Sequence, residues 1–164
     1  MPGIKKTTLL LISVIILCGC APVISQQTLK SVDREIKIAD LAKYPEKYRG
    51  REVVLGGTIV SVENREDKTE VEVLDQPLNR RLMPVDPERS EGRFIAIFEG
   101  FKDPALYSRN RRITLAGVFK GIVKRKLGKM DYEYPVVESR EHYLWRAPYG
   151  EPSVGLGVGI GIGF

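Results

Sequence analysis

The apolar residues of this 164-residue chain are spaced differently in three zones. An apolar run broken only by Ser13 fills residues 9–17, shorter apolar segments rich in Val and Ile are spread over residues 52–145, and glycine alternates with large apolar residues over residues 154–164. We therefore divide the chain into residues 1–19, 20–37, 38–146 and 147–164.

The middle zone has the texture of β-strands. Residues 69–73 alternate between polar and apolar, which predicts a strand with one buried face, and residues 94–98 are apolar on both faces, as in a central strand. Residues 52–62 and 112–123 contain glycines that allow a strand to bulge or bend. Further strands over 132–137 and 141–145 bring the expected number to five or six.

Short helices and loops separate these strands. Ile38–Ala42 predicts one or two helical turns that end before Tyr44-Pro45, because proline pushes the preceding residue out of the α region. Asp103-Pro104 predicts a second short helix, with Asp103 as N-cap and proline at the first helical position. Residues 78–92 predict a long loop, and Leu127-Gly128 predicts a hairpin tip.

Bent strands with one or two short helices favour a mainly β fold class, namely a small OB-like closed or partly open β-barrel over residues 38–146. The predicted core contains Leu55, Ile59, Val71, Val73, Ile95, Ile97, Leu115 and Val136.

The N-terminal zone predicts a lipoprotein signal peptide. Two lysines precede an apolar run of about nine residues, which is too short to cross a bilayer as a helix. Leu17-Cys18-Gly19-Cys20 then follows the order of a bacterial lipobox, in which small residues precede the modified cysteine. We predict cleavage between Gly19 and Cys20, with a diacylglyceryl thioether and an N-acyl chain on Cys20. Cys18 is a poor candidate because Leu17 precedes it.

Cleavage and lipidation determine the localisation of the mature chain, its net charge and whether it can form a disulfide. Ala21, rather than aspartate, follows the lipidated cysteine, which by the enterobacterial sorting rule directs a lipoprotein to the outer membrane. The signal peptide carries two lysines and no acidic residue, so the net charge falls from +5 to +3 in the mature chain. Cys20 is then the only cysteine, its sulfur is used by lipid, and no disulfide can form. Residues 20–37 are polar and predict a tether.

Several motifs in one order resemble the Slp family, the starvation-inducible outer-membrane lipoproteins of Gram-negative bacteria. Besides the lipobox, they are Tyr44–Gly50 (YPEKYRG), Val54–Gly57 (VLGG), Ser90–Phe94 (SEGRF), Gly100–Pro104 (GFKDP) and Tyr134–Val137 (YPVV). The resemblance covers residues 38–145. It implies an outer-membrane lipoprotein with a β-rich domain and a role under stress or in stationary phase, and it implies no reaction.

Candidate chemistry in the remaining residues is sparse. His142 is the only histidine, which excludes a Cys/His pair or a multi-histidine metal site, and a surface or edge position is expected for it. Ser90 has no partner base and is expected in a turn. We therefore predict no enzyme, no catalytic residue, no metal and no cofactor beyond the lipid on Cys20.

One basic cluster is a candidate contact for an anionic surface. Lys124, Arg125, Lys126 and Lys129 surround the expected hairpin tip, although solvated lysines at a hairpin tip are the simpler interpretation. Basic residues beside tyrosines are also what OB barrels use for single-stranded nucleic acid. Location at the outer membrane argues against nucleic acid and favours outer-membrane lipid, an envelope protein or an anionic glycan.

Two functions remain open. The first is a lipid-anchored, non-enzymatic binding or structural module of the cell envelope. The second is a subunit or assembly factor of an outer-membrane complex that acts through the tail. Drawn as a strand, residues 154–164 place six apolar side chains on one face and five glycines on the other, which predicts self-association or pairing with a partner. A flexible glycine-rich tail is the alternative.

Overall fold

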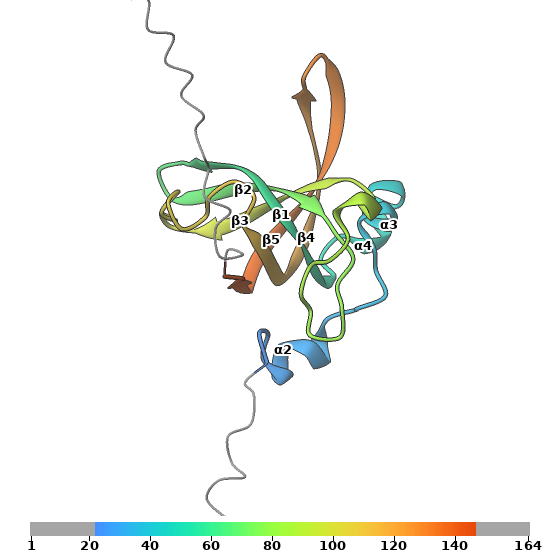
Figure 1. Ribbon diagram of the computed structural model, residues 1–164. Coiled ribbons are helices and arrows are strands. Elements are labelled where there is room, and N and C mark those ends of the chain that lie inside the picture. The colour runs from blue at the N-terminus through green and yellow to red at the C-terminus, as the bar shows by residue number, and fades with distance from the viewer. Residues whose placement is uncertain (1–21, 147–164) are drawn as a thin grey trace, which may run out of the picture.

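The computed structural model describes residues 22–146, which form a closed five-stranded β-barrel with short helices beside it (Figure 1). The strands are β1 (Glu52–Asn64), β2 (Lys68–Asp75), β3 (Arg93–Glu99), β4 (Arg112–Leu127) and β5 (Met130–Leu144). They close in the order β1-β2-β3-β5-β4, with β3 and β5 parallel and the other neighbours antiparallel. This is the order of an OB-type barrel, so the predicted fold class is confirmed.

Close strand contacts explain the glycines that the sequence places in β1. Gly57 pairs with Asp75 of β2, and a Cβ added to Gly57 would lie 1.9 Å from the carbonyl oxygen of Leu74. No side chain fits there without moving the β2 backbone. The register between β1 and β2 shifts between Ile59 and Ser61, so the bulge that the sequence suggested near Gly56-Gly57 lies a few residues later.

Most of the predicted core residues point into the barrel. The core cluster contains five of the eight predicted positions, and a sixth, Ile95, is buried outside that cluster. The five are Leu55, Ile59, Val71, Val73 and Leu115.

Two predicted core residues, Ile97 and Val136, are wrong. Both are only partly buried and lie outside the core cluster. The sequence makes β3 apolar on both faces, so alternation alone could not determine which face points inward. Phe94 and Phe98 occupy the inward positions of β3, and Val137 takes the inward position of β5 that was assigned to its neighbour.

Within residues 22–146, three short α-helices precede the barrel. They are α2 (Gln26–Ser31), α3 (Ile38–Lys43) and α4 (Pro45–Tyr48), and a 3-10 turn, η1 (Pro87–Arg89), lies in the long loop. The predicted helix at residues 38–42 is therefore confirmed as α3, which adds Ile38 and Leu41 to the barrel core. No helix among residues 22–146 is long and apolar enough to cross a membrane.

The helix predicted at Asp103-Pro104 is wrong. Asp103 does cap a turn, because its side chain accepts a hydrogen bond from the Ala105 backbone at 2.9 Å and its carbonyl accepts from Leu106 and Tyr107. The chain leaves the helical path after that one turn, and Tyr107 packs into the core instead.

Segment 22–37, predicted as a tether, is largely docked on the barrel. Ile24 is fully buried and packs with Val32, Val54, Leu82 and Ala116 in a second apolar cluster. Lipidation and cleavage at Cys20, and the tail at 147–164, lie outside the described residues.

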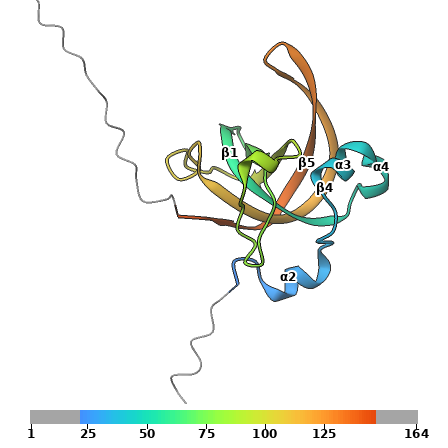
Figure 2. The ribbon, with the colours of Figure 1, turned by 45° about the vertical axis from the view of Figure 1, so that its right-hand side comes forward.

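The β4–β5 hairpin extends beyond the barrel at the end opposite to α2 (Figures 1 and 2). The predicted hairpin tip at Leu127-Gly128 is confirmed, and the expected separate strands at 132–137 and 141–145 are one strand, β5.

Candidate binding site

Three of the four hairpin cations predicted to contact an anionic surface form ion pairs within the protein. Lys124 lies 3.0 Å from Glu133 and Lys126 lies 2.7 Å from Asp131, each pair directly across the hairpin. Arg125 turns toward the barrel. Lys129, at the exposed tip, has no carboxylate within ion-pair distance among residues 22–146.

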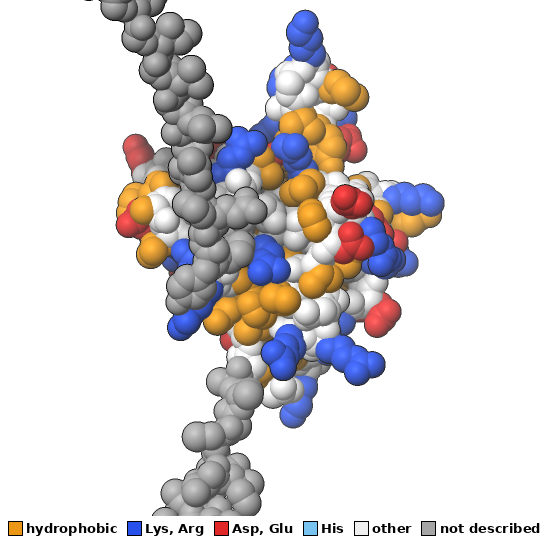
Figure 3. Space-filling model, viewed as in Figure 1, with side chains coloured by type: hydrophobic (Ala, Val, Ile, Leu, Met, Phe, Trp, Pro, Cys, Tyr) orange, Lys and Arg blue, Asp and Glu red, His pale blue; other side chains and the backbone are white. Residues whose placement is uncertain are grey.

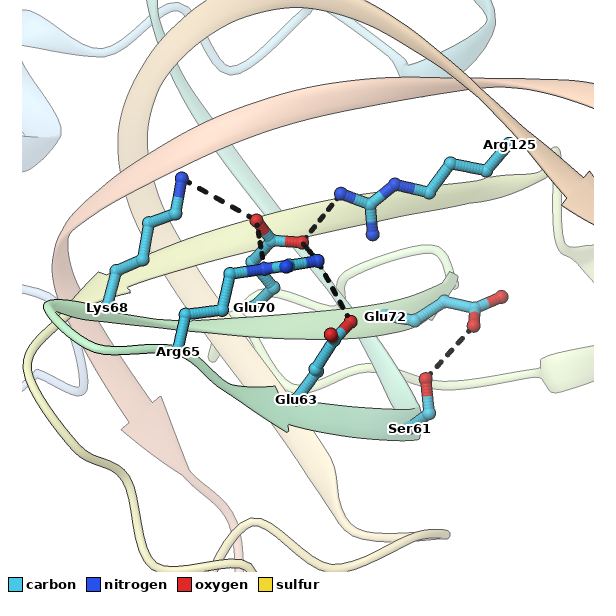
Figure 4. A network of polar contacts seen from close by, with 7 residues as sticks. All are labelled: Ser61, Glu63, Arg65, Lys68, Glu70, Glu72 and Arg125. Carbon is cyan, nitrogen blue, oxygen red and sulfur yellow. Dashed lines mark hydrogen bonds and ion pairs between the residues drawn. The ribbon is translucent and has the colours of Figure 1, made fainter.

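Arg125 joins a charged network centred on Glu70 of β2 (Figure 4). The Glu70 carboxylate accepts a 2.6 Å hydrogen bond from Arg125 and lies 3.1 Å from the Arg65 guanidinium and 3.6 Å from the Lys68 amine. Its side chain is only 8% exposed. Burial alone would raise the pKa of Glu70, but the hydrogen bonds and charges of Arg125 and Arg65 outweigh it and hold the pKa below its ordinary value.

A second carboxylate extends this network along β2. Glu72 accepts a hydrogen bond from Arg93 at 2.8 Å, from Tyr134 at 3.2 Å and from Ser61 at 3.1 Å. Tyr132 in turn accepts a 2.9 Å hydrogen bond from the backbone of Arg93. OB barrels bind ligands on this face and its loops. Here the charged side chains bind one another and tie the hairpin to the barrel, which leaves few of them for a ligand.

We expect Arg125→Met to lower the free energy of unfolding by about 1–2 kcal/mol at pH 7, because it leaves buried Glu70 with weaker partners. The matched control is Lys124→Met, which breaks a solvent-exposed pair and is expected to cost at most about 0.5 kcal/mol. The folded-state pKa of Glu70 is lowered, so its contribution is present above about pH 4.5 and is lost as the pH falls through the folded-state value. Urea unfolding of both variants measures this, and equal losses would contradict the network.

His142 and Ser90 both have structural roles, and His142 is half-buried instead of lying at the surface. His142 of β5 lies with its Nε2 atom 2.7 Å from the Tyr107 hydroxyl and packs edge-on against Phe98. Burial lowers the pKa of His142, and the Lys102 charge lowers it further. Ser90 donates to the Gly92 carbonyl in a turn. No group of three His, Cys, Asp or Glu side chains within residues 22–146 is arranged to hold a metal ion.

A cavity of about 300 Å³ lies where β2 ends and the long loop begins. Asp75, the last residue of β2, lines it together with Gln76, the segment before α3 and the loop 76–91. The apolar part of the wall consists of Ile36, Ile38, Val54, Leu55, Pro77, Leu78 and Leu82. Arg34, Lys37, Arg89 and Glu91 stand at its exposed positions.

Among the residues that line this cavity, Asp75 is unusual because it is a buried carboxyl group with a raised pKa. It is 9% exposed, and no side chain or backbone group of the described residues donates a hydrogen bond to its carboxyl group. Gln76, its buried neighbour, donates from Nε2 to the Thr58 hydroxyl at 2.9 Å. Burial, with a smaller contribution from the Glu91 charge, raises the pKa of Asp75 from 3.8 to about 7. Glu91 itself lies 3.6 Å from the Lys37 amine.

Sequence reasoning missed Asp75, although a signal was present. The inward positions of β2 are Thr69, Val71, Val73 and Asp75, because side chains alternate along a strand. The alternation found at 69–73 therefore continues to Asp75 and places a carboxyl group at a position that elsewhere in the strand is apolar or hydroxyl-bearing.

Comparison with known proteins agrees with the resemblance noted in the sequence. The family model "Outer membrane lipoprotein Slp family" matches residues 17–156. The uncharacterized lipoprotein YeaY of Escherichia coli (strain K12) is 30% identical over 131 residues, which cover 80% of this chain and 67% of that protein. Outer membrane protein Slp of the same organism is 29% identical over 101 residues, covering 62% of this chain and 53% of the relative. The chain thus matches about half to two thirds of the length of these relatives.

Two solved structures are similar in outline. They are OBody AM1L10 and OBody AM3L09, each bound to hen egg-white lysozyme, with TM-scores of 0.43 and 0.44 and 15% sequence identity. They cover 71% and 70% of this chain, and this chain covers 95% and 96% of theirs.

Proposed function

Because the chain belongs to the outer membrane lipoprotein Slp family, we propose that it is a non-enzymatic binding module that takes a small ligand in the Asp75 cavity. Membership in this family makes it a lipid-anchored protein of the outer membrane. The observation that supports a binding role is the Asp75 carboxyl group, which is nine-tenths buried, lacks a hydrogen-bond partner among the described residues, and lines a cavity.

Burial of the Asp75 carboxyl group is costly chiefly for its ionised form. The carboxyl oxygens are not fully enclosed and face the cavity, and the low solvation there disfavours the negative charge. A group with a strongly shifted pKa in a cavity is therefore a candidate site, because a bound ligand supplies the missing partner. The lining residues contain no serine, cysteine or histidine that Asp75 could activate, so the arrangement favours binding over catalysis.

The lining indicates the class of ligand. Ionised Asp75 attracts a positive group, and the side chains at Ile36, Val54 and Leu78 offer an apolar wall. A primary ammonium group on a short apolar body satisfies both features. Glu91 is already paired with Lys37, and Arg34 and Arg89 lie at exposed positions of the lining. The volume of about 300 Å³ is at the lower end of the range for small-molecule sites.

Titration with n-hexylammonium tests this proposal, and 1-hexanol serves as the neutral control. The mature chain with Cys20→Ser provides a form without lipid, and the backbone amide signals of Asp75 and Gln76 report on the cavity. We expect hexylammonium to bind more tightly at pH 8 than at pH 6, because binding requires ionised Asp75 and its pKa in the free protein is about 7.

Asp75→Asn is expected to abolish this binding at both pH values. Glu88→Gln, an exposed residue of η1, is the matched control and should bind like the parent chain. Binding of hexanol with equal affinity, or unchanged binding by Asp75→Asn, would exclude the ammonium site.

The second candidate function, assembly through the tail, is favoured by the strict alternation over residues 154–164. We expect deletion of residues 151–164, with Cys20 retained, to reduce the oligomer size and the crosslinks formed at the outer membrane. The reason is that a segment pairing as a strand would offer its unpaired backbone N–H and C=O groups to another chain. Size-exclusion chromatography and envelope crosslinking measure this, and an unchanged pattern would leave the flexible tail as the remaining interpretation.

A further inference from the structure

The end of the barrel that carries α2 lies close to the lipid anchor. Ile24 is fully buried against the barrel, and only three residues separate it from Cys20, the predicted lipid-bearing residue. Four chain steps span at most about 14 Å, even when fully extended. A barrel docked in this way cannot move far from the bilayer surface.

Specific contacts hold the start of this segment on the barrel. The backbone amide of Ser25 donates to the Glu141 carboxylate at 2.7 Å, and the Ser25 hydroxyl donates to the second Glu141 oxygen at 3.0 Å. Ile24 and Val32 flank α2 and are both buried in the second apolar cluster, with Leu82 of the long loop. Because Glu141 belongs to β5, the first described residues are clamped to the barrel wall itself.

Basic side chains gather at the same end. Lys30 lies in the last turn of α2, Arg34 follows that helix, and Arg80 with Arg81 stands in the loop that packs on it. All four are exposed, and within residues 22–146 none has a carboxylate within ion-pair distance. Of the acidic residues that follow α2, Asp33 is paired with Arg51 at 3.3 Å and Glu35 is exposed. Figure 3 shows Lys and Arg side chains around this lower end of the molecule.

We propose that the α2 end of the barrel, with Lys30, Arg80 and Arg81, lies directly on an anionic bilayer surface, and that the β4–β5 hairpin points away from it. Both ribbon views place α2 and the hairpin at opposite ends of the barrel (Figures 1 and 2). Lys129 and Met130 at the hairpin tip, the latter 74% exposed, therefore point away from the bilayer into the aqueous space on the protein's own side of the membrane.

Single labels on the lipidated protein test this orientation. The mature chain has no cysteine other than Cys20, so a cysteine introduced at Gln27 in α2 or at Gly128 in the hairpin tip can be labelled selectively after lipidation. The protein is reconstituted in vesicles of equal parts phosphatidylethanolamine and phosphatidylglycerol that carry a headgroup-attached quencher. We expect strong quenching at residue 27 and almost none at residue 128. Equal quenching at both positions, or the reverse order, would overturn the proposal.

Charge neutralisation tests the basic end separately. Each lysine or arginine side chain near an anionic surface adds to the attraction between the protein and the membrane. Loss of two such charges in Arg80→Gln with Arg81→Gln should weaken binding of the Cys20→Ser chain to these vesicles about thirtyfold. The matched control, Lys126→Gln with Lys129→Gln in the hairpin, should bind like the parent chain. A larger loss in the hairpin variant would mean that the hairpin is the membrane contact, which would also overturn the proposal.

Discussion

Asp75→Asn is expected to stabilise the folded protein by about 4 kcal/mol at pH 8, although it removes the ionisable group of a proposed binding site. The carboxyl group of Asp75 has a folded-state pKa of about 7, against 3.8 in its ordinary environment. Each unit of pKa difference is worth about 1.4 kcal/mol between the two protonation states. Asparagine has nearly the same shape and remains neutral, so it avoids the cost of burying a charge.

The pH dependence distinguishes this origin from an ordinary packing effect. A raised folded-state pKa means that the folded state binds the proton more tightly than the unfolded chain. Stability from this group is therefore fully present below pH 3.8 and is lost as the pH rises through about 7. The advantage of Asp75→Asn should grow from pH 4 to pH 7 and level off above pH 8. Urea unfolding across this range measures it, with Glu88→Gln as an exposed control. An advantage that does not vary with pH would refute the assignment.

A residue that destabilises its own fold is best explained by what it does for the protein. Natural proteins depart from local folding rules at functional sites in particular and compensate elsewhere. The gain in stability expected for Asp75→Asn, together with the expected loss of hexylammonium binding, would link the cost of Asp75 to ligand recognition.

The barrel could be predicted from the sequence because most of its strands have one apolar face. Alternation over residues 69–73 placed Val71 and Val73 in the core, and the same phase reaches Asp75. The cavity could not be predicted, because its wall comes from β1, from the segment before α3 and from a loop with no periodic pattern. Only the packing of these segments brings Arg34 and Leu78 to the same opening.

Tertiary packing also explains why residues 22–37 do not behave as a tether. Helix α2 is only six residues long and has no buried residue of its own, so neither its length nor its periodicity marks it in the sequence. The buried residues Ile24 and Val32 flank the helix, and they pack on the outer side of the barrel. An apolar cluster on the outside of a barrel is built from isolated apolar residues, and no periodic pattern in the surrounding polar sequence marks them.

Phe98→Ala is expected to destabilise the protein by about 3–5 kcal/mol, the usual cost of removing a phenylalanine from a packed core. Phe98 is 2% exposed, points into the barrel, and packs edge-on against Tyr107 and His142. Its ring therefore supports both the barrel core and the contact between the Tyr107 hydroxyl and the His142 ring. Urea unfolding gives the loss of free energy, and the ring signals of His142 should shift because their neighbour is gone.

Ile97→Ala provides the matched comparison on the same strand. Ile97 is half-buried, lies outside the core cluster and pairs with Glu70 and Glu138 across the neighbouring strands. We expect a loss of about 1 kcal/mol, because its truncation leaves no enclosed cavity and water can fill the space. The sequence alone assigned Ile97 to the core. The two variants therefore decide whether Ile97 or Phe98 points from β3 into the barrel. A larger loss for Ile97→Ala than for Phe98→Ala would mean that the strand faces the other way, and the core built from Phe94 and Phe98 would then be wrong.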